Sequence, residues 1–174
     1  MGIFKRKVIS PIPEENIGTW ITPNKYKVNF VTPTPTPAPV VQTQERTFDV
    51  EPFRKSGNYQ IPKMPASLAT KIWDMFPNEA TQAAIVLGTE NASYDPKAYN
   101  WNPKDNSGDY GLAQINSRTL ADRMKYEPQN VEATGVSNVY DLHDPEKNLK
   151  MMKLIRKSQG WNAWYGPKNR GFEL

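Results

Sequence analysis

The 174-residue sequence contains no cysteine and a single histidine, His143. Without thiols the chain cannot form disulfides, thiolate metal sites or a cysteine nucleophile. One histidine cannot supply a multi-histidine zinc site, and a Ser-His-Asp triad would have to run through His143 alone. We therefore expect no metal and no other cofactor, and we assign His143 no catalytic role.

Long hydrophobic runs are also missing. The longest, Ala83 to Leu87, is far shorter than the ~20 residues that cross a bilayer. No hydrophobic signal-peptide region follows the early cations Lys5, Arg6 and Lys7. We expect no membrane span and no signal peptide.

The sequence also lacks a large excess of charge of either sign. Lys and Arg number 22 against 18 for Asp and Glu, a formal net charge of +4. Residues 51–174 hold 16 cations and 14 anions, a difference of only +2. That excess is too small for a dedicated nucleic-acid-binding domain, so we expect no nucleic-acid partner.

Proline is abundant, but only near the N-terminus. Ten of the 16 prolines fall within the first 65 residues, and residues 32–39 alternate proline with threonine or alanine. Such a sequence disfavours helix and sheet and favours an extended spacer. Residues 1–62 are therefore predicted to form an extended arm and linker. Within it, residues 16–31 fit either a short docking strand or a tail with scattered apolar residues.

Helical periodicity begins after Pro65. Leu68, Ile72 and Phe76 are spaced by four residues, and a second apolar pattern runs from Ala80 to Leu87, with Asn78 as its expected N-cap. A polar, turn-rich stretch follows over residues 91–109, in which we expect a loop and two short strands.

A further helix is predicted between Asp144 and Gly160. Asp144 is a good N-cap, Pro145 suits the first helical position, and Gly160 is typical of a helix end. Residues 63–174 are therefore predicted to form one mainly α (α+β) domain with a small β-region.

Two carboxylates flank the polar stretch. Glu90 follows Leu87 by three residues, so on a continuing helix it projects from the apolar side, where burial would raise its pKa toward that of a general acid. Asp109 comes nineteen residues later. Glycoside hydrolysis uses such a pair of acids. A calcium loop starting at Asp105 is disfavoured, because it would require Gly at 110 and Glu at 116, where the chain has Tyr110 and Asn116.

Residues 89–118 resemble the active-site block of the lysozyme-like superfamily, which includes lytic transglycosylases and animal-type lysozymes. In that family a Glu ends a helix and a polar β-region leads to Gly-Leu-Met-Gln-Ile or Asp-Tyr-Gly-Ile-Leu-Gln-Ile-Asn. Here the counterparts are Glu90 and the run Asp109-Tyr110-Gly111-Leu112-Ala113-Gln114-Ile115-Asn116. The likeness extends weakly to residues 144–148 and 160–164, and it covers none of the first 60 residues.

The resemblance implies a lysozyme-like fold with Glu90 as catalytic acid and Asp109 as second carboxylate. Because many transglycosylases lack an acid at the second position, both hydrolysis and formation of an anhydro-sugar stay open. The chain departs from the family at Asn91, where Ser is usual, and at Ala113, where a bulkier residue is usual, so that the cleft floor is expected to be roomier.

Aromatic and amide side chains around these acids are expected to bind an amino-sugar polymer, because aromatic rings stack on sugars and amides pair with N-acetyl groups. The predicted substrate-binding residues are Tyr110, Gln114, Asn116, Asn100 and Trp101. Of Trp161 and Trp164, at least one is expected in the core.

The whole chain resembles phage virion-associated lysozymes that cleave peptidoglycan between N-acetylmuramic acid and N-acetylglucosamine. We expect a place in the tail or capsid, with the arm contacting other virion proteins. The alternatives are an endolysin that waits in the host cytoplasm and an inactive wall-binding or structural module.

Overall fold

The structure, a computed structural model, describes residues 46–174; the proline-rich linker and residues 16–31 lie outside this range. Helices predominate beside a small sheet, which confirms the predicted mainly α (α+β), lysozyme-like class. The elements are η1 (Glu51–Phe53), α1 (Ala66–Met75), α2 (Ala80–Glu90), β1 (Tyr99–Asn102), β2 (Ser107–Tyr110), β3 (Ile115–Asn116), α3 (Ser117–Tyr126), α4 (Pro128–Glu132), η2 (Val139–His143), α5 (Pro145–Gln159), η3 (Trp161–Ala163) and α6 (Gly166–Asn169).

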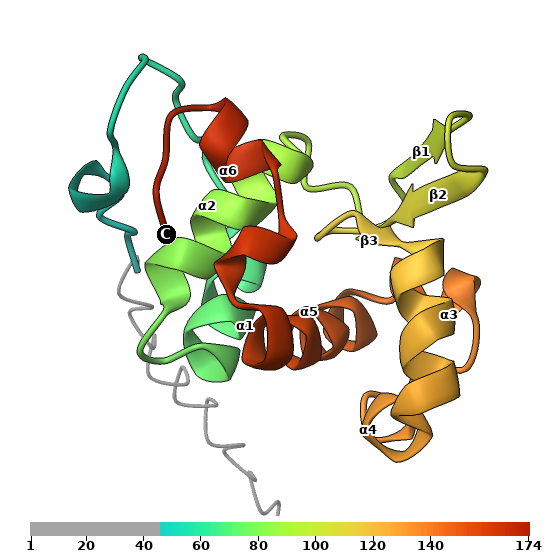
Figure 1. The fold of residues 1–174 in the computed structure, drawn as a ribbon. Coiled ribbons are helices and arrows are strands. Elements are labelled where there is room, and N and C mark those ends of the chain that lie inside the picture. Colours follow the sequence, from blue (N-terminus) through green and yellow to red (C-terminus); the bar gives the residue numbers. More distant parts are fainter. Residues whose placement is uncertain (1–45) are drawn as a thin grey trace, which may run out of the picture. The chain divides into compact units, whose positions relative to one another are not determined.

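Helix α2 lies at the centre of the helical part. Every residue from Ala83 to Thr89 is buried, so apolar side chains surround the whole helix. Helices α1 and α6 pack against it, and α5 runs from this group toward the sheet, α3 and α4 (Figure 1). As a result, Glu90 lies at the C-terminal end of a buried helix, at the junction with the sheet.

The start of α2 differs from the prediction. Its N-cap is Glu79 and not Asn78, and no side chain caps the helix there. The Glu79 carboxylate instead pairs with the Arg156 guanidinium of α5. Tertiary pairing with a neighbouring helix has taken the place of local capping.

The predicted helix α5 is confirmed at both ends. The Asp144 side chain accepts hydrogen bonds from the backbone N–H groups of Glu146 and Lys147, each 2.9 Å long. Gly160 ends the helix with φ of 71°, a left-handed conformation that glycine adopts without strain.

The sheet has three antiparallel strands in the order β1-β2-β3, one more than predicted. Asp109 on β2 pairs with Asn100 on β1 and with Asn116 on β3. Because side chains alternate along a strand, Asn100 and Asn102 share one face of β1, and Tyr99 and Trp101 share the other. The face with the asparagines and Asp109 turns toward the end of α2.

The described part of the predicted arm, residues 46–62, packs on the helical domain. Phe48 stacks on Trp73 of α1 with ring centroids 5.7 Å apart, and Arg54 pairs with Phe172 in a β-bridge. Pro52 lies in the first turn of η1, where its missing N–H leaves no bond unmade. The predicted boundary at residue 62 thus falls inside a segment that shares the packing of the helices.

Candidate active site

A cleft of about 420 Å³ opens between the end of α2 and the sheet, a size typical of small-ligand sites. Acidic and amide side chains dominate its polar lining. These residues are Glu90, Asn102, Asp105, Asp109, Gln114 and Asn116. The structure therefore brings the two predicted carboxylates into one cavity.

Glu90 is half-buried at the last position of α2. Its Oε1 accepts a hydrogen bond of 2.7 Å from the backbone N–H of Gly166, the first residue of α6. Burial raises the pKa of Glu90, the Gly166 N–H lowers it to a smaller extent, and the nearby charge of Asp109 raises it further. Burial is the largest of these effects, so the pKa of Glu90 is raised overall, in the direction that a proton donor needs.

Gly166 is in close contact with this carboxyl group. A Cβ atom built on Gly166 would lie 2.6 Å from Glu90 Oε1, well inside van der Waals contact. Only glycine at this position lets the backbone N–H reach the acid so closely. No sequence pattern predicts this contact, because Gly166 is 76 residues away from Glu90.

Asp109 occupies the opposite wall, on β2. Its Oδ1 accepts a hydrogen bond of 2.8 Å from Asn116 Nδ2. Burial raises the pKa of Asp109, hydrogen bonds from the Asn116 and Asn100 amides lower it, and the charge of Asp105 raises it. Asp109 is thus held by neutral side-chain donors, which favour a carboxylate without neutralising its charge.

The loop between β2 and β3 is fixed by a buried asparagine. Asn148 of α5 is fully buried; its Nδ2 donates to Tyr110 O (3.0 Å) and Leu142 O (2.8 Å), and its Oδ1 accepts from Ala113 N (2.9 Å). Asn91, beside Glu90, donates to Gly111 O at 3.3 Å. These bonds link the two walls of the cleft through the loop.

Ala113 does not form the cleft floor, contrary to the expectation from its small size. It is fully buried, and its carbonyl accepts a hydrogen bond of 2.9 Å from Trp164 Nε1. The Trp164 side chain lines the cleft near this contact. The small side chain of Ala113 therefore does not widen the cleft, because Trp164 and not Ala113 lines it.

The five predicted substrate-binding residues divide between the two faces of the sheet. Gln114 and Asn116 line the cleft, and Asn100 faces it as a partner of Asp109. Tyr110 and Trp101 do not line it: the Tyr110 ring packs against Tyr99, and Trp101 is exposed on the same side. The alternation of side chains along the strands separates the amides from the aromatic rings.

Residues outside the motif also line the cleft. Tyr165, 74% exposed, is one of the aromatic residues near the C-terminus that the sequence offers for stacking on sugars, and it lines the cavity. Thr119 of α3 and Asp105 also line it, and Asp105 accepts from Ser107 Oγ at 2.6 Å. The sequence does not predict these last two positions, because they depend on packing between separate segments.

Both C-terminal tryptophans are in the core, each 7% exposed, as predicted for at least one. His143 lies outside the cleft lining, with its ring 5.7 Å from that of Tyr110.

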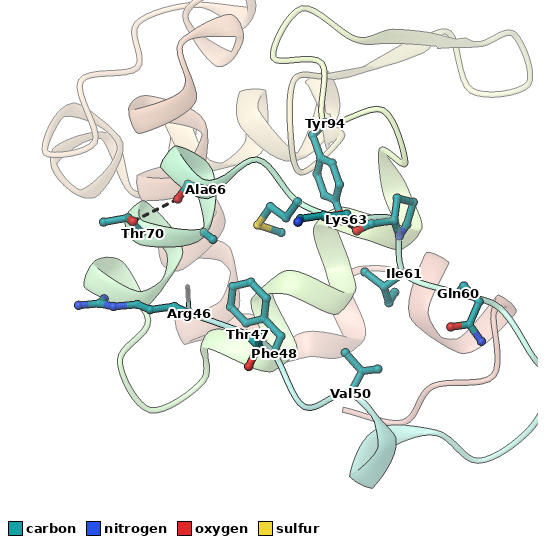
Figure 2. A pocket seen from close by; sticks show the side chains of 13 residues that line it. Arg46, Thr47, Phe48, Val50, Gln60, Ile61, Lys63, Ala66, Thr70 and Tyr94 are labelled. Atoms are coloured by element: carbon teal, nitrogen blue, oxygen red, sulfur yellow. Dashed lines mark hydrogen bonds between the residues drawn. The ribbon is translucent and has the colours of Figure 1, made fainter. Parts of the chain in front are cut away.

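A larger hollow of about 590 Å³ lies between residues 46–64 and α1 (Figure 2). Its described lining is mostly apolar, including Phe48, Ile61 and Tyr94, and contains no carboxylate. Proton-transfer chemistry on a sugar needs an acid, so the smaller cleft is the candidate active site.

Among residues 46–174, no group of three or more His, Asp or Glu side chains could hold a metal ion. Within the same residues, none of the helices is both long and apolar enough to cross a membrane.

Comparison with known proteins agrees with this geometry. The model of the transglycosylase SLT domain matches residues 70–157, half of the chain. The chain belongs to the transglycosylase SLT domain family. The match contains both walls of the cleft, with Glu90 and Asp109, and it ends before Gly166.

Lysozymes of animals are also similar to this SLT domain. Lysozyme C of Camelus dromedarius is 38% identical over 80 residues, which cover 45% of this chain and 61% of the relative. Lysozyme c-1 of Anopheles gambiae is 34% identical over 85 residues, covering 49% and 58%. Lysozyme C-1/C-2 of Axis axis is 36% identical over 93 residues, covering 52% and 71%. The chain thus spans about three fifths of the length of the first two relatives.

Proposed function

We propose that this SLT domain cleaves the β-1,4 bond between N-acetylmuramic acid and N-acetylglucosamine in peptidoglycan, with Glu90 as the proton donor. The observation that carries the proposal is the position of Glu90 opposite Asp109 in one cleft, half-buried, with a raised pKa. The family match and the similarity to lysozymes support the same substrate class.

In the first step Glu90 gives its proton to the bridging oxygen. The bond from this oxygen to C1 of N-acetylmuramic acid breaks, its electron pair leaves with the oxygen, and positive charge develops on the sugar ring. The Asp109 carboxylate stabilises this charge or bonds to C1. Water then attacks C1, the Glu90 carboxylate takes the proton of that water, and any bond between Asp109 and C1 breaks with its electron pair returning to the Asp109 carboxylate.

The amides Gln114 and Asn102 line the cleft and provide donors and acceptors for the N-acetyl and hydroxyl groups of the sugars. Exposed Tyr165 offers an aromatic face at the same cleft. We assign these side chains to substrate binding, together with Asn116 and Asn100, whose amides also orient Asp109.

A second candidate is lytic transglycosylation, which the description of the matching family favours. In this reaction the 6-hydroxyl of N-acetylmuramic acid attacks C1, and Glu90 takes its proton, so that a 1,6-anhydro end forms and no water is added. The amide-bound Asp109 in the cleft favours hydrolysis, because it supplies the second carboxylate that the anhydro route does without.

The decisive variant is Glu90→Gln, which keeps the shape of the side chain and removes the acid. Lysis of purified cell walls is expected to fall at least about 1000-fold while the variant stays folded, with a melting temperature no lower than that of the wild type. The matched control is Glu132→Gln, an exposed acid on α4, which should leave lysis unchanged. Wild-type lysis by Glu90→Gln would refute the assignment.

The products distinguish the two reactions. Mass spectrometry of digested peptidoglycan should show hydrated reducing ends if the domain is a hydrolase. Ends lighter by one water molecule would establish the transglycosylase reaction. Binding of glycan fragments without any product would instead support an inactive wall-binding module.

We also propose that the protein is carried in a phage particle and acts on the cell wall from the tail or capsid. The alternating proline sequence at residues 32–39 supports this, because a semi-rigid spacer suits a tethered enzyme. Mass spectrometry of purified particles tests the location. Absence from particles, with accumulation in the infected cytoplasm, would favour the endolysin alternative.

A further inference from the structure

The segment formed by residues 53–62, here called the strap, crosses the C-terminal end of the helix that carries Glu90. The Tyr59 hydroxyl donates a hydrogen bond of 2.9 Å to the carbonyl of Gly88, two residues before Glu90. Carbonyls in the last turn of a helix have no partner within the helix. Tyr59 therefore satisfies one of these carbonyls from outside the helix.

The contact between the strap and α2 is close. A Cβ atom built on Gly88 would lie 2.6 Å from Ile61 Cγ2, so any larger residue would push the strap away. Next to this contact the Tyr94 hydroxyl donates to Pro62 O at 2.8 Å, and burial raises the pKa of Tyr94 to about 12. The strap thus lies directly against the last turn of α2.

The same strap is bound to the residues that follow α6. Lys55 N donates to Gly171 O at 2.8 Å, and Glu173 N donates to Phe53 O at 2.9 Å. The Arg170 guanidinium lies 4.6 Å from the centroid of the Tyr59 ring. Tyr59 therefore contacts both the α2 end, through its hydroxyl, and the tail after α6, through its ring.

The strap is thus attached to the end of α2 and to the residues after α6, and these attachments flank the hydrogen bond between Glu90 and Gly166. Glu90 lies at the end of α2, and its backbone partner Gly166 begins α6. We propose that Tyr59 is a positioning residue, which sets the distance between the Glu90 carboxyl group and the Gly166 N–H. The inference rests on the proposed function of Glu90 and adds a residue from outside the part of the chain that matches the family.

Tyr59→Phe tests the proposal, because it removes the hydroxyl and keeps the ring beneath Arg170. With a soluble oligosaccharide of alternating N-acetylglucosamine and N-acetylmuramic acid, kcat should fall about tenfold while KM stays within about twofold, since misplaced catalytic groups reduce turnover. Carbon-13 NMR should show a higher pKa for Glu90, because the N–H that lowers it has moved away.

The matched control is Thr134→Val, which also removes a hydroxyl that donates to a backbone carbonyl, Val131 O at 2.6 Å, at a site away from the cleft lining. Its kcat and the pKa of Glu90 should equal those of the wild type at temperatures where both variants are folded. Equal losses in both variants would mean that Tyr59 acts only through stability, and would overturn the proposal.

Gly88→Ala provides a second variant, because its methyl group would lie 2.6 Å from Ile61 Cγ2 and 2.9 Å from the Tyr94 hydroxyl and so displace the strap, while Tyr59 keeps its hydroxyl. It should reproduce the lower kcat and the raised pKa of Glu90. Wild-type kcat in Tyr59→Phe, or a fall in the pKa of Glu90, overturns the positioning role. If Glu90→Gln is inactive in that case, the proposed function survives; if Glu90→Gln is active, the proposed function fails by itself.

Discussion

The two walls of the cleft hold their carboxylates by different means. On the helical wall, Glu90 ends a buried helix and receives one backbone N–H, from Gly166. On the sheet wall, Asp109 lies on a short strand and receives amide groups from the strands on either side, Asn116 and Asn100. Burial raises the pKa of both acids, but two hydrogen-bond donors oppose it at Asp109 and only one at Glu90.

Under the proposed function, this difference suits each acid to a separate task. A carboxyl group in a dry wall with few donors keeps its proton, as a general acid must. The amide donors around Asp109 oppose the rise in its pKa that burial causes, and so favour the carboxylate that would stabilise a positive sugar. Neither task follows from the residue type alone, since both side chains are ordinary acids.

The largest expected effect comes from removing the acid of each wall in a separate variant. Glu90→Gln should reduce lysis at least about 1000-fold, and Asp109→Asn should reduce it about 100-fold, because loss of the proton donor leaves the bridging oxygen a poor leaving group. Lysis of purified walls by both variants, side by side, gives the ratio. Equal losses would show that the two acids do not differ in their roles.

Asn148→Ala tests how far the sheet wall depends on α5. The variant removes the Asn148 partner of Ala113 N and Leu142 O in a buried site and of Tyr110 O in a partly buried one, so the free energy of unfolding should fall by about 3 kcal/mol. The melting temperature should fall by roughly 10 °C or more. The exposed Asn130→Ala serves as control, and a similar small change in both variants would contradict the anchoring role of Asn148.

Gly166→Ala affects the helical wall alone. Its new Cβ atom would overlap Glu90 Oε1, so the carboxyl group has to move and kcat should fall between about 10- and 100-fold. Gly160→Ala is the control for a nearby glycine, since nothing lies within 4 Å of a Cβ atom there, although its φ of 71° will cost some stability. Unchanged kcat in Gly166→Ala would mean that the N–H contact is not needed.

Local sequence patterns predicted the helices α1, α2 and α5, but not α3, α4, α6 or the third strand. The spacing of Leu68 and Ile72 predicted α1, and Asp144 with Gly160 predicted both ends of α5, because these signals act within a few residues. The N-cap of α2 was predicted wrongly at Asn78: it is Glu79, whose side chain pairs with Arg156 of a different helix and does not cap α2. Distant pairing of this kind leaves no trace in a local pattern.

The candidate site likewise contains residues that the sequence predicted and contacts that it did not predict. The motif placed Glu90, Asp109, Gln114 and Asn116 in one stretch, and all four line the cleft. Trp101 was predicted as a cleft residue from its type and neighbourhood, but strand alternation turns it to the other face. The Gly166 contact depends on how α6 returns to α2, which only the complete packing determines.

The smallest expected effect is the pH dependence of the melting temperature that the proton of Glu90 causes. Because burial raises the pKa of Glu90 above its ordinary 4.5, the folded state binds this proton more tightly than the unfolded chain does. The stabilisation is present below the ordinary value and is lost as the pH rises through the raised one. Glu90→Gln carries no charge and can still accept from Gly166 N, so its melting temperature relative to the wild type should rise by a few degrees between about pH 4 and pH 7. The same difference should be smaller for Asp109→Asn, because amide donors favour its charged form. Calorimetry at both pH values measures each difference, and a pH-independent result for Glu90→Gln would contradict a fold that favours the protonated acid.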